Sequence, residues 1–169
     1  MKRIIYYLLL IIALCFVSEV KAQNNYVKTN FGSEINDLNN LCLSVEFGHF
    51  FTPNSAFELE YAHGFKKENI YSNKIGINYL YEFDDDFIAP YMKMGVGYKQ
   101  YSYKYSSETK HFNGADFKIG FGINVYITNK FSLSVGFDLS NTAIIYDSEW
   151  HWDWDSSLFT PKIGLSHNF

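Results

Sequence analysis

Several features that define common protein classes are scarce in this sequence. Only two cysteines occur, Cys15 and Cys42, and Cys15 lies in a segment that we expect to be removed, so no intramolecular disulfide is predicted. Basic residues are outnumbered, 14 against 18 acidic ones, which argues against nucleic acid as a partner. After the first 22 residues, no apolar run approaches the roughly 20 residues of a membrane-spanning helix. A disulfide scaffold, a nucleic-acid binder and a helical membrane protein are therefore not expected.

The N-terminal segment has the three parts of a signal peptide. Positive charges at Lys2 and Arg3 precede an apolar run over residues 4–17, and a short polar stretch ends at Ala22. The run is too short for a spanning helix, which disfavours an uncleaved anchor, the alternative reading. We expect cleavage after Ala22, giving a signal peptide over 1–22 and one mature domain over 23–169. Lys2, Arg3, Lys21 and Glu19 leave with the signal, so the mature chain carries 11 basic and 17 acidic residues.

Most of the mature chain alternates apolar and polar residues with period two, which is the pattern of β-strands with one apolar and one polar face. In Tyr71–Phe83, for example, the odd positions are mostly aromatic or aliphatic and the even positions are mostly polar or glycine. Another strand, near Tyr26–Phe31, is weakly patterned and is inferred from topology. The same alternation predicts six further strands over 41–51, 57–65, 88–102, 115–127, 131–139 and 159–169.

The predicted connections alternate in length along the chain. Tight turns are expected at 52–55, 84–87 and 128–130, and longer loops at 32–40, 106–113 and 147–157, with 66–70 intermediate. Outer-membrane barrels place short turns in the periplasm and longer loops outside. This scheme closes only if the chain starts on the periplasmic side, which is why a strand near Tyr26 is required.

Alternation alone does not separate a membrane barrel from a soluble one such as a lipocalin, because the two differ only in which face looks inward. The apolar faces contain no Asp, Glu, Lys or Arg, and nine of the 11 glycines fall on the polar faces. Glycine leaves room inside a narrow barrel, whereas a solvent-facing exterior has no need of it. The sequence therefore predicts an all-β fold, an eight-stranded antiparallel transmembrane up-and-down β-barrel with a polar interior.

The same parity places a set of charged side chains inside the barrel. Six acids against five bases suggest mutual salt bridges that fill the lumen, because buried charge is tolerated when it is paired. The alternative is a narrow charge-lined pore for ions or small solutes. The predicted lumen network is Glu46, Glu58, Glu60, Lys74, Glu82, Lys93, Lys99, Asp116, Lys118, Asp138 and Lys162. Cys42 is expected to be a small interior filler.

The last strand carries a family resemblance. Lys162, Gly164 and the terminal Phe169 stand where small outer-membrane β-barrels carry the signal read by the barrel-assembly machinery, although His167 replaces a usual apolar or aromatic residue. Over residues 23–169 the sequence resembles this porin-like family, of the OmpX type and the OmpA transmembrane-domain type. The resemblance implies a Gram-negative outer membrane, contact with lipid and lipopolysaccharide, no cofactor, and roles from adhesion to envelope stability.

An enzyme is the less favoured hypothesis. Asp138-Leu139-Ser140-Asn141, with Glu149 beyond, is similar to the His-x-Ser-Asn motif of lipid A deacylases, which also have an eight-stranded barrel. Aspartate stands in place of the histidine, and it cannot act as a base tuned near neutral pH for a serine hydroxyl. Parity also points Ser140 into the lumen. No catalytic site is therefore predicted.

The loop over 147–157 alternates tryptophan with polar residues: Trp150, His151, Trp152, Asp153 and Trp154. His151, Asp153 and Asp155 could share one face and bind a metal, but no fixed ligand geometry supports this. We expect the tryptophans to contact lipopolysaccharide headgroups or an extracellular ligand, rather than only to pack at the barrel edge. The leading hypothesis is a non-enzymatic barrel that displays this loop and a second one at 104–113.

Overall fold

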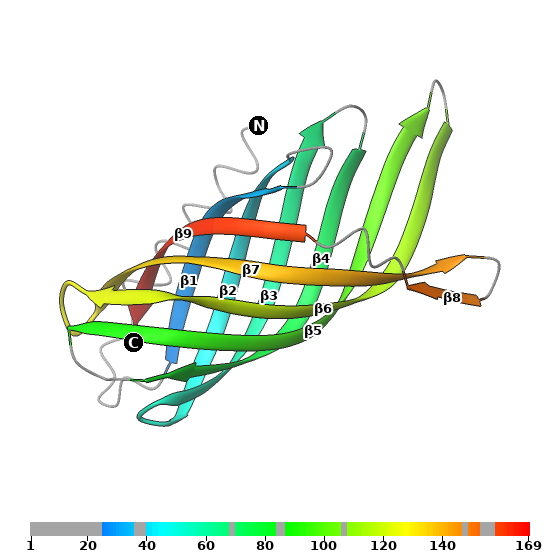
Figure 1. Cartoon of the computed structure of the whole chain (residues 1–169). Coiled ribbons are helices and arrows are strands. Elements are labelled where there is room, and N and C mark those ends of the chain that lie inside the picture. Colours follow the sequence, from blue (N-terminus) through cyan, green and yellow to red (C-terminus); the bar gives the residue numbers. More distant parts are fainter. Residues whose placement is uncertain are drawn as a thin grey trace.

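The computed structural model describes residues 25–35, 40–67, 70–83, 87–105, 108–146, 149–152 and 158–169. The predicted signal peptide and its cleavage site lie outside these residues. The described chain is built entirely of antiparallel strands and their connections (Figure 1). The strands are β1 (Asn25–Glu34), β2 (Asn40–Thr52), β3 (Ser55–Lys67), β4 (Ile70–Glu82), β5 (Ile88–Tyr105), β6 (Glu108–Tyr126), β7 (Phe131–Tyr146), β8 (Glu149–Trp152) and β9 (Leu158–Asn168).

Eight of the nine strands close into a barrel. Sequential neighbours pair from β1 to β7, β7 pairs with β9, and β9 pairs with β1. β1, predicted only from topology, joins the two ends: Asn30 lies opposite Ser44 of β2 and Gly164 of β9. The predicted eight-stranded antiparallel barrel is confirmed. Because the eight-stranded wall has no free edge, the backbone donors and acceptors of its strands are paired within the wall, as a lipid environment requires.

Tight turns lie at one end of the barrel, together with the C-terminus (Figure 1). β2 ends at Thr52 and β3 begins at Ser55. In the turn between β6 and β7, the Thr128 hydroxyl accepts hydrogen bonds from the backbone N–H groups of Lys130 and Phe131, at 3.2 and 3.0 Å. Such side-chain bonds stabilise a short reversal, so this end matches the predicted periplasmic side.

The opposite end differs from the prediction. Residues 108–113, expected in a loop, belong to β6 and pair with β5 up to Tyr105 opposite Glu108. Within the predicted loop 147–157, β8 pairs with the end of β7. Both loop predictions were wrong in extent because the hairpins project beyond the apolar belt. There both faces of a strand can be solvated, so apolar-polar alternation is lost while backbone pairing continues.

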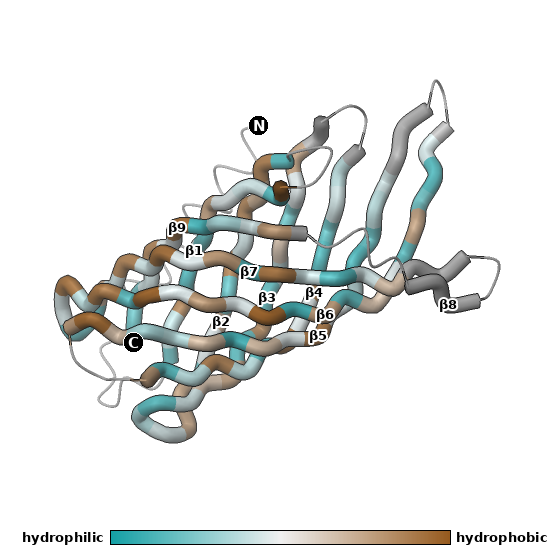
Figure 2. Tube along the Cα trace, in the orientation of Figure 1, coloured by the Kyte–Doolittle hydropathy of each residue, from teal (hydrophilic) through white to brown (hydrophobic). Residues whose placement is uncertain are grey.

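The barrel wall has an apolar outer face and a polar inner face. Side chains such as Val135, Ile163 and Ile77 are 60%, 63% and 58% exposed on the outside, whereas most of the buried side chains are polar or charged. Figure 2 shows the resulting alternation of hydrophobic and hydrophilic residues along the strands. The described part of the chain contains no helix that is long and apolar enough to cross a membrane.

Candidate functional site

The candidate site is the charged interior of the barrel. All eleven residues of the predicted network lie inside it, nine with 5% exposure or less, and Lys162 and Lys74 with their side chains 8% and 12% exposed. Sequence reasoning missed two further members, Lys28 and Glu34 of β1. The available signal was the parity of Tyr26, Lys28 and Asn30, all buried on one face. This alternation was hard to recognise, because the aromatic Tyr26 points inward while the polar Thr29 points outward. The two additions carry opposite charges, so the near balance is kept.

One cluster of ion pairs is centred on Lys93. Its ammonium nitrogen lies 2.8 Å from Glu46 and 2.6 Å from Glu58. The Tyr26 hydroxyl donates to Glu58 at 2.6 Å, and Lys28 lies 4.0 Å from the same carboxylate. Removing charges from water is costly, and close opposite charges with added hydrogen bonds offset that cost. This cluster therefore ties β1, β2, β3 and β5 together across the lumen.

A second cluster surrounds Glu60. Lys118 lies 2.5 Å from this carboxylate, Lys74 lies 3.8 Å away, and Lys162 lies 4.0 Å away. Lys162 also contacts Asp138 and lies 3.6 Å from Glu46, which connects the two clusters. Lys74 contacts Asp116, which accepts a hydrogen bond from the Thr142 hydroxyl at 2.9 Å. Together the two clusters thus form one continuous network of ion pairs that reaches all eight strands of the barrel.

The two ends of the lumen are closed differently. Near the tight turns, Glu82 accepts hydrogen bonds from Asn124 at 2.5 Å and from the Tyr126 hydroxyl at 2.8 Å. Within the described residues Glu82 forms no ion pair, so the expectation of a salt bridge at this position was wrong: amide and phenol donors satisfy the carboxylate instead. Toward the hairpins, Lys99 lies 2.8 Å from Glu34.

Glycines make room for the largest interior side chains. A Cβ added to Gly122 would lie 2.6 Å from the Tyr91 hydroxyl, and one added to Gly136 would lie 2.6 Å from the Phe121 carbonyl oxygen. Both distances are far below van der Waals contact. Gly122 lies directly opposite Tyr91 on the neighbouring strand, and Gly136 lies opposite Gly122 on the next one. The Tyr91 ring can therefore lie over β6 and β7 on the inside of the barrel only because these two positions lack side chains.

The lumen cavities lined by the described residues are small. A cavity of about 30 Å³ lies among Glu34, Cys42 and Lys162, and another of about 10 Å³ lies between Lys28 and Glu82. These volumes suit one or two water molecules. Neither cavity could hold a cofactor, and the donor set around them, ammonium groups included, does not suit a metal ion. Cys42 is buried and free, lining the larger cavity.

Two residues of the predicted assembly signal lie in β9, and the third, Phe169, directly follows it. Lys162 and Gly164 face the lumen, where Gly164 lies against Asn30 and Ser134. The ring of Phe169 packs on the outer wall, 6.1 Å from Phe47. His167 is the residue that departs from the family pattern. The centroid of its ring lies 4.8 Å from that of Phe131 and 6.2 Å from that of Phe169, so the imidazole packs where the family pattern has an apolar or aromatic side chain. Recognition by the assembly machinery stays a prediction.

The predicted interaction loop is only partly described. Trp150, His151 and Trp152 belong to β8, with Trp150 opposite Ile145 and Trp152 opposite Ala143. Asp153, Trp154 and Asp155 lie outside the described residues, so the metal alternative has no geometry to judge. Ser140, of the deacylase-like motif, lines the lumen cavity of about 30 Å³, and none of the described residues that line this cavity is a histidine.

Comparison with known proteins matches these features. Neisserial surface protein A superposes with a TM-score of 0.72 at 13% identity, covering 86% of this chain and 97% of its own. The N-terminal β-barrel domain of Pseudomonas aeruginosa OprF gives 0.64 at 17% identity, covering 87% and 98%. Ail, the attachment invasion locus protein of Yersinia pestis, gives 0.56 at 10% identity, covering 86% and 96%.

These structural likenesses confirm the fold. Comparison with curated protein sequences gives no match. One family model, described as the outer membrane protein beta-barrel domain, matches residues 8–158. With its closed barrel and charged interior, the chain therefore belongs to the outer membrane β-barrel protein family.

Proposed function

We propose that this protein is a closed, non-conducting outer-membrane barrel that displays its projecting hairpins on the cell surface. The observation that carries the proposal is the lumen network, in which Lys93, Glu60 and Lys162 bridge opposite walls and, among the described residues, line cavities of about 30 and 10 Å³. An eight-stranded barrel has space for side chains or one small ligand. With the space filled, the remaining functional surfaces are the outer wall and the projecting hairpins.

Three hairpins project from the end opposite the C-terminus, formed by β3–β4, β5–β6 and β7–β8 (Figure 1). We assign this end to the outside, because short turns face the periplasm in outer-membrane barrels. Adhesion or envelope stability would follow from what the hairpins bind. No enzymatic role is proposed, since Ser140 has no histidine beside it in this cavity within the part of the chain that the structure describes.

The chemistry of the chain narrows the class of ligand. One structural neighbour, Ail, was crystallised with the heparin analogue sucrose octasulfate, which supports a ligand-binding role for barrels of this shape. The present chain has 18 acidic and 14 basic residues, and three of the basic ones lie in the predicted signal peptide. A polyanion is therefore disfavoured, and we propose a neutral or cationic ligand for the hairpins.

Cysteine labelling on intact cells tests the display. Thr109→Cys places a thiol at an exposed position near the tip of the β5–β6 hairpin, and Asn129→Cys places one in the exposed turn between β6 and β7. A membrane-impermeant maleimide should label Thr109→Cys on whole cells and Asn129→Cys only after permeabilisation. The native Cys42 is buried and should stay unlabelled. The reverse pattern would overturn the orientation.

A further inference from the structure

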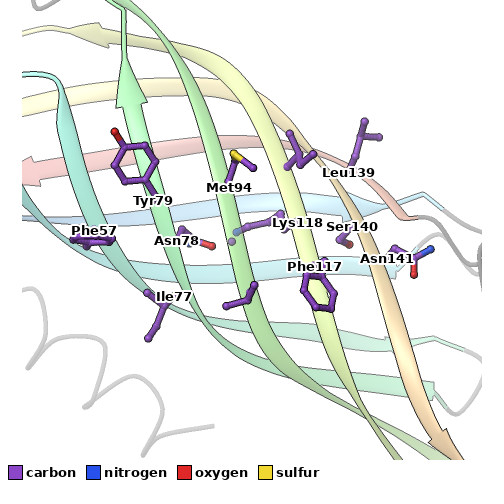
Figure 3. Close-up of a pocket in the computed structure, with 13 residues that line it drawn as sticks. Phe57, Ile77, Asn78, Tyr79, Met94, Phe117, Lys118, Leu139, Ser140 and Asn141 are labelled. Carbon is purple, nitrogen blue, oxygen red and sulfur yellow. The ribbon is translucent and has the colours of Figure 1, made fainter. Parts of the chain in front are cut away.

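The outward side of the projecting sheet differs from the apolar belt beneath it. In the belt, the outer wall carries an apolar groove of about 630 Å³, whose walls include Ile77, Val96 and Phe117 (Figure 3). Toward the hairpins, the same outward alternation brings up polar and aromatic residues, none of them Lys, Arg, Asp or Glu. Strand register places them in two rows across β3 to β6: His63, Asn73, Gln100 and Asn113 below, and Tyr71, Ser102 and His111 above. We call these seven residues the neutral face.

The upper row of the neutral face lies beyond the apolar band. Tyr71 lies eleven residues before the end of β4 at Glu82, and His111 lies fifteen residues before the end of β6 at Tyr126. With a rise of about 3.3 Å per residue and a tilt of about 40°, these two positions are about 28 and 38 Å from the turn end of their strands. Since the apolar band of such barrels is about 25 Å tall, the upper row lies outside the hydrocarbon.

Hydrogen bonds hold the lower row in place. Asn73 Oδ1 lies 2.8 Å from His63 Nδ1 and accepts from the Tyr61 hydroxyl at 3.1 Å, and the Gln100 amide donates to Asn113 Oδ1 at 3.1 Å. Because an amide has two donors and two acceptor lone pairs, the N–H groups of Asn73 and Asn113 and the carbonyl oxygen of Gln100 keep capacity for a ligand. Donors and acceptors therefore alternate along the row.

The upper row adds aromatic rings. Ser102 is buried, and its hydroxyl lies 2.8 Å from His111 Nδ1, which holds the exposed imidazole and leaves its Nε2 for a ligand. Tyr71 lies on the other side of Ser102. Phe65, which is exposed, packs edge-on against His63 with 5.3 Å between the ring centroids. Rings beside amides combine apolar surface with groups that orient a ligand.

The neutral face is large enough for more than a single small group. Neighbouring strands lie about 4.8 Å apart, so the lower row extends over about 14 Å, and the two rows are separated by about 7 Å along the strands. Such an area suits an extended ligand of a few units. The internal hydrogen bonds fix several of its side chains in advance, which lowers the entropy cost of binding.

We propose that the neutral face binds an uncharged oligosaccharide. Sugar hydroxyls both donate and accept, as the amides of the lower row do, and the apolar C–H faces of sugar rings can stack on Tyr71 and His111. A sulfated chain would call for cationic partners, which the seven residues do not include. An extended peptide would pair with a free strand edge, whereas Asn73 and Gln100 lie on strands paired on both sides.

This inference rests on the proposed display of the hairpins and narrows their ligand to a neutral sugar chain. A glycan array tests it, with the full protein in phosphatidylcholine nanodiscs so that no bacterial sugar competes. The array carries uncharged, sialylated and sulfated oligosaccharides, and isothermal titration calorimetry then gives the Kd of the best uncharged one. We expect saturable binding to uncharged members, with sulfated members bound at least tenfold more weakly.

Variants locate the binding on the neutral face. Asn73→Leu with Asn113→Leu removes two amides from the lower row and should raise the Kd at least tenfold. The matched control is Asn25→Leu with His49→Leu, a pair with the same 2.8 Å contact between Nδ1 and Oδ1 on exposed residues at the turn end, and it should keep the wild-type Kd. Heat-modifiable gel migration shows that each variant is folded.

Three results would overturn the proposal: no binding to any uncharged oligosaccharide, a preference for sulfated ones, or the same Kd in all folded variants. Failure of the proposed display would appear separately, as labelling of Asn129→Cys on intact cells. That labelling does not depend on sugar binding, and sugar binding by the purified protein does not depend on orientation.

Discussion

In this barrel, neighbouring residues of one strand face different environments: one points into the polar lumen and the next points outward from the barrel wall. On β3, Glu58 and Glu60 are 1% and 2% exposed, whereas Leu59 and Tyr61, which alternate with them, are each 52% exposed. A soluble protein would bury the apolar pair and expose the acids. The comparison shows that the interior is stabilised by paired charge and that the exterior tolerates none, so a given substitution should act differently on the two faces.

Breaking the charge network should have the largest effect. Glu60→Ala leaves Lys118, Lys74 and Lys162 without a shared carboxylate, and removal of one partner of a buried ion pair costs about 3–5 kcal/mol. Urea unfolding in lipid vesicles, followed by tryptophan fluorescence, measures the free energy of unfolding. Glu60→Gln keeps the shape and should cost less than Glu60→Ala. A change below about 0.5 kcal/mol, the size of an ordinary surface effect, would contradict a structural role for the network.

A charge on the outer face should have the next largest effect. Val135 is 60% exposed on β7 and is flanked by Ile123 and Ile163. Val135→Arg places a guanidinium in hydrocarbon and should cost about 2–4 kcal/mol, while Val135→Leu should be neutral. The same unfolding assay checks both variants. Equal stability of the arginine and leucine variants would mean that this face does not contact lipid.

Filling a glycine position should have an intermediate effect. Gly122→Ala pushes a methyl group against the Tyr91 ring and the Val135 carbonyl oxygen, and overpacking of this kind costs about 1–3 kcal/mol. Tyr91→Leu in the same chain should recover part of the loss, because it removes one of the two clashes. A double-mutant cycle with additive changes would show that the interior is looser than described.

The smallest effects should come from the projecting part of β6, where the difference between faces disappears. Thr109 and Lys110 are adjacent and both exposed. Thr109→Lys and Lys110→Thr should each change the free energy of unfolding by less than about 0.5 kcal/mol. A large effect of only one of the two substitutions would show that the two faces of the strand still differ in environment at the hairpin tip.

The barrel itself could be predicted from the sequence because the membrane imposes strict alternation. Leu59 faces outward and Glu60 faces the lumen, and a register shift of one residue would turn each side chain to the other face of the wall. The assignment of the polar face to the inside followed from glycines such as Gly122. β1 was nearly missed, since Thr29 on its outer face and Tyr26 on its inner face weaken the contrast, and Lys28 was missed with it.

Other features depended on information that is not local. Which lysine pairs with which carboxylate is decided by strands far apart in the chain, as for Lys93 of β5 and Glu46 of β2. The hydrogen-bond partners of Glu82 are Asn124 and Tyr126, and their polarity alone did not identify them as its partners. The extents of β5 and β6 were underestimated because periodicity ends where the membrane ends, although pairing continues to Tyr105 and Glu108.

Conductance across planar lipid bilayers tests most directly whether the charge network seals the lumen. Purified, folded protein should give no discrete current steps above the bare bilayer, in the same chamber in which a trimeric porin conducts. Discrete steps in the wild type that change when Lys93 or Glu60 is neutralised would contradict a sealed lumen and would favour a narrow charge-lined pore.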